Sequence, residues 1–289
     1  MRILTDEQIL SMLRCPICHA GMMTVPTGSL VCTGARRHCF DFGASGYVNL
    51  SAPGQSGGGD SKAAVRARSR FLDGQWYRPV ADGLAQALED YASTPTQHTV
   101  IDAGCGEGYY SERIASLGYH TVGVDLSKFA VDAAAKRARA VSCDHSFYAV
   151  AGVYDMPFAD ASASAVINVF APCAEEEYTR VLKDGGVLIV AHAGEQHLMG
   201  LKRILYDTPN ENGLRADLPK HMTLLEQRRV LYTVNVEGRE AIEDLFSMTP
   251  YYWRTSIEDA NRLAGLDVLQ TEVDVLLSNY RKTEGSGKA

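Results

Sequence analysis

The chain has 289 residues, of which 46% are hydrophobic and 22% charged, and this composition permits one large globular core with a small satellite domain. It has no apolar run near the roughly 18 residues that a membrane-spanning helix needs, and its first residues lack an apolar signal segment, so we expect a cytoplasmic protein with no membrane partner. The net charge of −7 argues against strong nonspecific binding of nucleic acid. Residues 1–80 nevertheless carry nine Lys/Arg against five Asp/Glu, so an anionic polymer would contact this part.

The N-terminal segment carries the ligands of an expected zinc site. Four of the seven cysteines fall within the first forty residues. In a C-P-x-C turn, Cys15 and Cys18 present two thiolates on one side of a tight loop, as tetrahedral zinc requires. A short helix is expected over 3–13 and a hairpin over 22–31, after which Cys32 supplies a third thiolate.

Two adjacent residues compete for the fourth position of this zinc site. Thiolate softness favours Cys39, whereas a mixed shell that includes His38 is equally sound chemistry. Strand pieces expected over 40–42 and 46–50 would complete a module that is too small to fold without a metal. The alternative interpretation is a cluster of free thiols.

The stretch 51–61, S-A-P-G-Q-S-G-G-G-D-S, is a flexible linker by composition and the clearest boundary in the chain. Two helices are expected after it, a basic one over 62–72 and a second over 79–91 with proline in its first turn. We therefore expect three parts, namely a small zinc-binding domain over 1–50, a linker with connecting helices over 51–95 and an α/β domain over 96–289.

The rest of the chain alternates strands and helices, which predicts a parallel sheet with helices on both faces. Strands are expected at 99–103, 120–125, 146–151, 164–171 and 186–192. Helices are expected at 109–117, 127–139, 175–182 and 195–206. A polar, lid-like loop over 205–227 should be followed by two late strands at 229–236 and 268–278, by helices at 239–247 and 256–264, and by a frayed tail from 280. The whole predicts a Rossmann-like, seven-stranded sheet whose final strand is antiparallel.

The stretch V-I-D-A-G-C-G-E-G-Y-Y at 100–110 joins a strand, a glycine turn and a helix start. Glycines let the main chain bend sharply and let a ligand approach it, and the first N–H groups of the helix face the same cavity. Asp125, at the end of the next strand, lies where a ribose hydroxyl would be held. The D-x-G-x-G-x-G spacing resembles the first motif of class I S-adenosylmethionine (SAM) methyltransferases rather than a dinucleotide site. The alternative is a glycine-rich turn in another α/β protein. We predict SAM binding by Asp102, Gly104, Gly106 and Asp125.

Several stretches together resemble one family over nearly the whole chain. They are C-P-I-C-H (15–19), H-C-F-D (38–41), G-Y-V-N-L (46–50), G-D-S (59–61), F-L-D-G (71–74), D-A-G-C-G-E-G-Y-Y (102–110), A-P-C (171–173), H-L-M-G-L-K (197–202) and M-T-P-Y-Y-W-R (248–254). The combination resembles the ribosomal RNA large subunit methyltransferase A family, which uses SAM to methylate N1 of a guanine in a hairpin of bacterial 23S rRNA. One branch protects bacteria against macrolides of the tylosin type, so the resemblance raises antibiotic resistance as a role. The glycine motif is shared with all class I methyltransferases, whereas the zinc knuckle joined to G-Y-V-N-L is far more specific.

The resemblance implies ligands for both groups. For zinc it implies Cys15, Cys18, Cys32 and His38, with Cys39 as the alternative fourth ligand. For SAM it implies Tyr77, Gly106, Glu107 and His197. The partner that it implies is the 23S rRNA hairpin, and it leaves a homodimer open.

The implied reaction needs a base that accepts a proton and aromatic side chains on which the target guanine can stack. Guanine N1 carries a proton at neutral pH, so a group must accept that proton as the methyl group arrives. The candidates for this base are Glu107, Glu195 and His197. Because the target base must leave its stack, Phe170 and Trp253 are candidates for side chains on which it would stack. For Trp253 the alternative is core packing.

The N-terminal third is the expected RNA-binding part. We expect the zinc module and the basic helix, through Arg68 and Arg70, to hold the hairpin by shape and by phosphate contacts. Two other functions compete with this one. A small-molecule SAM methyltransferase would need neither the zinc module nor the basic helix. A non-catalytic RNA-binding zinc protein would not need the intact glycine motif.

Overall fold

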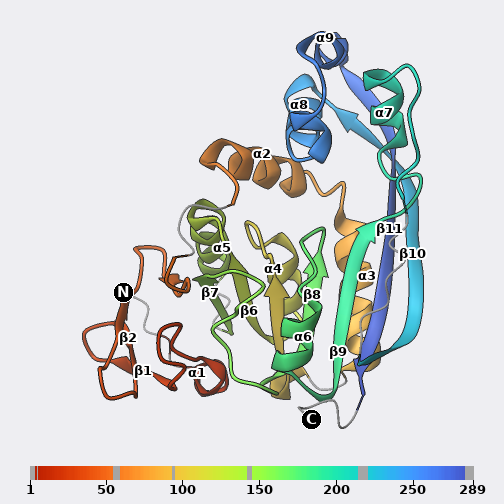
Figure 1. Ribbon diagram of the computed structural model, residues 1–289. Helices are drawn as coiled ribbons and strands as arrows, with labels where there is room; N and C mark the ends of the chain where they lie inside the picture. The colour runs from red at the N-terminus through yellow and green to blue at the C-terminus, as the bar shows by residue number, and fades with distance from the viewer. Residues whose placement is uncertain are drawn as a thin grey trace.

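A sheet of eight strands forms the centre of the computed structural model, which describes residue 4 and residues 6–54, 59–92, 95–141, 145–213 and 221–283 (Figure 1). The strand order is β10-β11-β9-β8-β5-β6-β7-β4. Five strands of the centre are parallel, namely β5 (Thr99–Ala103), β6 (His120–Asp125), β7 (Ser146–Val150), β8 (Ala163–Val169) and β9 (Leu182–Ala193). The late strands β10 (Met222–Glu237) and β11 (Val268–Lys282) pair with each other in antiparallel fashion, and β11 is antiparallel to β9. The predicted seven-stranded sheet is confirmed, and β4 (Val48–Asn49) widens it.

Helices cover both faces of this sheet (Figure 1). The connecting helices of the parallel part are α4 (Tyr109–Ala115), α5 (Lys128–Ala140), α6 (Glu175–Val181) and α7 (Met199–Leu205). Ahead of them come α2 (Lys62–Asp73), α3 (Arg78–Tyr91) and the 3-10 turn η1 (Pro95–Gln97). Between the late strands lie α8 (Arg239–Ser247), η2 (Pro250–Trp253), α9 (Ile257–Ala260) and η3 (Asn261–Leu263). In Figure 1, α2 and α8 lie beyond the end of the sheet to which the parallel strands point.

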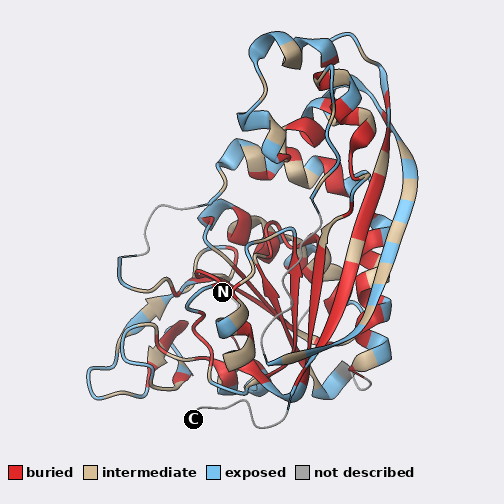
Figure 2. Cartoon of the chain, turned by 45° about the vertical axis from the view of Figure 1, so that its right-hand side comes forward, coloured by how far each residue is buried: buried red, intermediate tan, exposed pale blue. Residues whose placement is uncertain are grey.

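Burial follows the position of each strand in the sheet. Every residue of β5, β7 and β8 is buried (Figure 2). A parallel strand that is covered on both faces is mostly apolar on both sides, as these sequences are, with Asp102 and Asn168 as buried polar exceptions. The edge strand β10 instead alternates half-buried and exposed residues. Within the residues described above, no helix is long and apolar enough to cross a membrane.

The N-terminal module packs directly on the large sheet. It consists of α1 (Glu7–Met12) and a small antiparallel sheet of β1 (Met22–Val25), β2 (Ser29–Cys32) and β3 (Cys39–Asp41). Leu13 forms a bridge with Phe158, and the backbone N–H of Arg14 donates to the Pro157 carbonyl at 2.8 Å. Buried residues of the module, such as Leu30, belong to the same apolar cluster as Val166 of β8.

The sequence pattern predicted that the stretch 46–50 completes the zinc module, and the structure bears this out in part, since Val48 forms an antiparallel bridge with Phe42 just after β3. Val48 and Asn49 pair in parallel with β7, and the N–H of Leu50 donates to the Val150 carbonyl at 2.9 Å. The prediction did not include this second pairing, which covers the edge of β7 and leaves Val48 and Leu50 fully buried.

Two other boundaries differ because β10 and β11 pair over their full lengths. Met222 lies opposite Lys282, so residues 222–227 are strand rather than lid. Tyr280, expected in a frayed tail, is buried and pairs with Leu188. The remaining tail positions 284–289, the lid positions 214–220 and the linker positions 55–58 lie outside the described residues.

The helix expected over 195–206 begins four residues late, at Met199. The chain first turns at Gly194, whose carbonyl accepts from the N–H of His197 at 3.1 Å. The carboxylate of Asp274 accepts from the N–H of Gln196 at 2.9 Å. A contact with a distant strand therefore holds this segment out of the helix.

Candidate functional site

The glycine turn between β5 and α4 has the predicted strand–turn–helix form. Gly104, Gly106 and Gly108 all have positive φ angles. At Gly104, an ideal Cβ would lie 2.5 Å from the Cβ of Ala171, and at Gly108 it would lie 2.8 Å from the Cβ of Ala134. Only glycine avoids both the backbone strain and these clashes. The turn therefore lies against its neighbours and presents its backbone at the carboxyl end of the sheet.

Asp102 lies behind the glycine turn and is fully buried. The hydroxyl of Ser111 donates to Asp102 Oδ2 at 2.5 Å, which ties α4 to the end of β5. Among the described residues, Asp102 Oδ1 has no hydrogen-bond partner. Burial raises the pKa of Asp102 to about 7, and the hydrogen bond from Ser111 opposes this rise.

Asp125 joins the glycine turn to the turn after β6. Its Oδ2 accepts from the N–H of Gly106 at 3.1 Å, and its Oδ1 accepts from the N–H of Ser127 at 2.7 Å. Burial raises the pKa of Asp125, while these two N–H groups favour its charged form. Each carboxylate oxygen has a second lone pair, so Asp125 can also accept from a hydroxyl such as that of a ribose.

Glu107 is a buried acid at the glycine turn, with 2% of its surface exposed. Its Oε2 has no hydrogen-bond partner in the described part of the chain. Burial raises its pKa, and the guanidinium of Arg68, whose Nη1 lies 3.9 Å away, opposes that rise. A buried acceptor without a donor is costly. Glu107 Oε2 is therefore suited to accept a hydrogen bond from a bound ligand.

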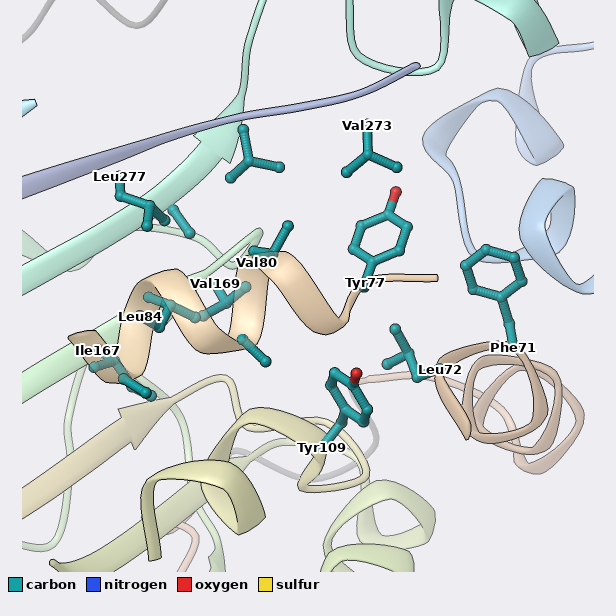
Figure 3. Close-up of a cluster of buried hydrophobic side chains, with 14 of the residues drawn as sticks. Phe71, Leu72, Tyr77, Val80, Leu84, Tyr109, Ile167, Val169, Val273 and Leu277 are labelled. Atoms are coloured by element: carbon teal, nitrogen blue, oxygen red, sulfur yellow. The ribbon is translucent and has the colours of Figure 1, made fainter. Parts of the chain in front are cut away.

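Tyr77 and His197 come from separate elements and, together with Phe170, form a ring cluster that is called the aromatic wall below. The hydroxyl oxygen of Tyr77 lies 3.2 Å from His197 Nε2, and both side chains are buried. The N–H of Asp274 donates to His197 Nδ1 at 3.2 Å, so the ring proton is assigned to Nε2, facing Tyr77. Burial lowers the pKa of His197 to about 4, which keeps the ring neutral near pH 7. Tyr77 belongs to the apolar cluster of Figure 3, beside Phe71 and Leu72 of α2.

Asp274 and Arg229 anchor this wall, and sequence reasoning missed both. Arg229 donates from Nε and Nη2 to the two carboxylate oxygens of Asp274, at 2.8 and 2.9 Å. Burial opposes the charge of Asp274, but Arg229 and the N–H of Gln196 hold its pKa below the ordinary value. The available signal was a single acid in the otherwise apolar stretch V-D-V-L-L at 273–277.

Phe170 completes the wall at the end of β8. Its ring stacks on His197 with centroids 5.4 Å apart and meets Tyr77 edge-on at 6.4 Å. Phe170 has a φ of +53° and remains 46% exposed. The structure thus brings three predicted site residues together and leaves the side chain of Phe170 about half exposed.

The other two candidates lie at the surface. Trp253 is 83% exposed on η2, and its ring packs edge-on against Tyr252 at 5.1 Å. Core packing was therefore the wrong alternative for Trp253. Glu195 is exposed between β9 and α7.

The two arginines expected to face RNA are paired with carboxylates. Arg70 donates to both oxygens of Asp244, at 2.8 and 2.6 Å, and so joins α2 to α8. Arg68 points to the glycine turn instead. Arg36, Arg37, Lys62 and Arg66 are exposed in this part of the chain, and so are Arg70 and Arg78, which pair with Asp244 and Asp82.

A second site lies in the N-terminal module. The Cys15, Cys18, Cys32 and His38 side chains each offer one atom, and these atoms all lie within 4.8 Å of one another. Cys18 and Cys32 are 3.7 Å apart between their sulfur atoms, and His38 Nδ1 lies 3.5 Å from both Cys15 and Cys32 Sγ.

These distances fit a zinc ion. Zn–S bonds of about 2.3 Å place the sulfur atoms of a tetrahedral site about 3.7 Å apart. The backbone N–H of His38 also donates to Cys32 Sγ at 3.1 Å, which favours a thiolate there. Cys39 is exposed on β3, and its thiol faces Asp41 at 4.0 Å. The cluster is therefore Cys3His with His38, the set that the family resemblance implied, rather than the set with Cys39.

Comparison with known proteins agrees with this geometry. Residues 100–186, which include the glycine turn and Asp125, match a family model described as a methyltransferase domain. YxjB of Bacillus subtilis, whose name provisionally assigns it as a 23S rRNA (guanine-N1)-methyltransferase, is 30% identical over 92% of this chain and 95% of its own. The 23S rRNA (guanine(748)-N(1))-methyltransferase of Streptomyces fradiae is 30% identical over 90% of this chain and 92% of its own. Among solved structures, YcgJ of Bacillus subtilis matches with a TM-score of 0.48 and 15% identity over 70% of this chain and 98% of its own.

Both curated relatives align over at least nine-tenths of this chain, well beyond the 100–186 range of the family model. The chain is a SAM-dependent methyltransferase, and it belongs to the 23S rRNA (guanine-N1)-methyltransferase family.

Proposed function

We propose that the chain transfers the methyl group of SAM to N1 of a guanine in a hairpin of 23S rRNA. The observation that carries this proposal is the alignment with a relative named for this reaction over nine-tenths of both chains. A small-molecule methyltransferase would need no Cys3His module packed on its sheet, and this chain has one. The reaction would take place where ribosomal RNA is found, in the cytoplasm.

The residues at the carboxyl end of β5 and β6 fit SAM. The positive-φ turn at Gly104 and Gly106 lets a ligand approach the backbone, Asp125 can accept from a ribose hydroxyl, and the free oxygen of Glu107 needs a donor. When bound, SAM would supply an electrophilic methyl group on its sulfonium. His197 would act by positioning: its Nε2–H holds the Tyr77 hydroxyl at one place on the wall. Asp102 would act from behind, through Ser111 and α4.

Glu195 is the best candidate for accepting the guanine proton. His197 has both ring nitrogens engaged, and Glu107 is buried beside the glycine turn. Glu195 is the exposed carboxylate of the three, on the segment that leads to His197. A base has to reach the proton that it takes, directly or through one water. The open face of Phe170 would stack with the displaced guanine.

The RNA would be held by exposed cations rather than by Arg68 and Arg70. Arg36 and Arg37 lie between β2 and β3 of the metal-holding module, and Lys62 and Arg66 lie on α2. Such side chains would contact phosphates and position the hairpin without reading its sequence.

Methyl transfer to RNA tests this function directly. The purified chain is incubated with methyl-labelled SAM and with 23S rRNA from a strain that lacks the modification. We expect label in the RNA and a reverse-transcription stop at one guanine, because methylation at N1 blocks its base-pairing edge. Label in a small-molecule fraction and none in the RNA would contradict the proposal.

A further inference from the structure

Arg68 does not extend to solvent from α2 but reaches the glycine turn. An ideal Cβ on Gly106 would lie 3.5 Å from Arg68 Nη1, and Glu107 Oε2 lies 3.9 Å from the same nitrogen. Only 24% of the Arg68 side chain is exposed. Its guanidinium is therefore part of the candidate cofactor site, although it comes from the basic helix that precedes the methyltransferase core.

Arg68 and Glu107 leave complementary groups unused. Glu107 Oε2 is buried and accepts no hydrogen bond from any described residue. Arg68 Nη1 is too far from that oxygen for a hydrogen bond, because 3.9 Å exceeds the normal range. The site thus places a cationic donor next to a buried acceptor that has no hydrogen-bond partner among the described residues, and a buried acceptor of this kind calls for a donor.

A ligand that matches such a pair has a positively charged group and a negatively charged group attached to the same carbon atom. An α-amino acid has an ammonium group and a carboxylate group, each able to make charge-assisted hydrogen bonds. We propose that Arg68 and Glu107 together recognise the amino-acid tail of the methyl donor, Arg68 by donating from Nη1 to its carboxylate and Glu107 by accepting from its ammonium. This inference rests on the proposed function, since the donor of that reaction carries such a tail.

The end of the linker holds Arg68 in this position. Asp60 Oδ2 lies 2.5 Å from Arg68 Nη2, and the Asp60 carbonyl accepts from the hydroxyl of Ser127 at 2.7 Å. An ideal Cβ on Gly59 would lie 2.6 Å from the nitrogen of Ser127, so this close approach needs glycine. Because Ser127 also donates its N–H to Asp125, the linker end and the ribose-binding candidate are attached to one turn. Asp60 is a positioning residue for Arg68.

Calorimetric titration with tail-bearing and tail-less ligands tests the pair. The ligands are S-adenosylhomocysteine, which has the amino-acid tail, and 5′-methylthioadenosine, which lacks it. Arg68→Ala should weaken binding of S-adenosylhomocysteine about ten- to hundredfold and change that of 5′-methylthioadenosine less than about twofold. Glu107→Gln should show the same selectivity, and Arg68→Lys should recover part of the loss. The matched control is Arg239→Ala, a surface arginine on α8 that pairs with Glu243, and it should leave both affinities unchanged.

Two results would overturn the pairing. The first is an equal loss for both ligands in Arg68→Ala, which would mean that the arginine only supports the shape of the site. The second is wild-type affinity for S-adenosylhomocysteine in Arg68→Ala. A wild-type chain that binds neither SAM nor S-adenosylhomocysteine would instead remove the methyltransferase function itself.

Discussion

Buried carboxyl groups dominate the candidate site at the scale of single residues. Asp102 lies in β5, Glu107 lies in the glycine turn after it, and Asp125 ends the neighbouring strand β6. Burial raises the pKa of each. Backbone N–H groups and Arg68 oppose this rise to different degrees. The three acids therefore differ in role: Asp102 supports α4, Asp125 links two turns, and Glu107 has an oxygen free for a ligand.

Asp102→Asn should stabilise the protein in a pH-dependent way. The native carboxyl has a pKa of about 7, above the value of about 3.9 in an unfolded chain. Above pH 7 the ionised native group therefore costs stability, and as the pH falls toward 4 the native state takes up the proton and this cost disappears. We expect Asp102→Asn to raise the free energy of unfolding by on the order of 2–4 kcal/mol at pH 8, and by less at pH 5. Urea unfolding at both pH values measures this, and equal changes at both would contradict it.

Glu195→Gln should slow methyl transfer without weakening cofactor binding. A general base contributes a factor of about 10² to 10⁴, and Glu195 is the exposed candidate, two residues before His197 in the chain. We expect kcat to fall at least about hundredfold, with unchanged affinity for S-adenosylhomocysteine. Glu89→Gln, which changes an exposed glutamate on α3, is the matched control. Wild-type turnover in Glu195→Gln would exclude this residue as the base.

At the scale of elements, α2 connects the glycine turn after β5 with helix α8. Arg68 reaches the glycine turn, whereas Arg70 forms a two-pronged ion pair with Asp244 of α8. On its apolar side, Phe71 and Leu72 lie in the cluster that holds Tyr77 (Figure 3). The basic character of this helix therefore serves internal contacts in part, and it overstates the surface available to RNA.

Arg70→Ala should loosen the contact between α2 and α8. The change leaves the Asp244 carboxylate, 6% exposed, without its strongest partner. We expect the free energy of unfolding to fall by about 1–3 kcal/mol, measured by urea denaturation. Adding Asp244→Asn should restore part of this loss, because the stranded charge is then gone. Arg66→Ala on the same helix should change stability by less than about 0.5 kcal/mol, and an equal effect of both arginines would refute the ion-pair argument.

For the whole molecule, the N-terminal module with the Cys3His cluster packs as a structural part of the methyltransferase sheet. Its apolar residues share one cluster with β8, and β4 extends the sheet beyond β7. Asp6 adds a polar contact, with its Oδ2 lying 2.5 Å from His120 Nδ1 at the start of β6. Loss of metal should therefore affect the stability of the entire chain.

Zinc removal should lower the melting temperature as a single transition. We expect the purified chain to hold one zinc ion, and Cys32→Ser to lose it with a fall in Tm on the order of 10 °C. Cys39→Ser is the matched control and should keep both metal and Tm, because Cys39 lies outside the cluster. Metal analysis and calorimetry measure both quantities. Retention of zinc in Cys32→Ser together with its loss in Cys39→Ser would reverse the assignment.

The amino-acid sequence alone determined the features that are local along the chain. The glycine turn, its neighbouring Asp125 and the alternation of strands and helices all follow from residue types at short spacing, and the structure has them where they were predicted. The C-P-x-C turn likewise indicated metal chemistry before any fold was known.

Only the tertiary structure decided what happens between distant segments. It turned Arg68 toward Glu107, joined Arg229 to Asp274 behind His197, and paired the stretch 46–50 with β7. Side-chain charge and strand propensity are the same whether a residue meets solvent, a partner or a sheet edge, so no local pattern distinguishes these outcomes. The partner is chosen by packing, because a buried charge or an open sheet edge must be satisfied by whichever segment the fold brings to it.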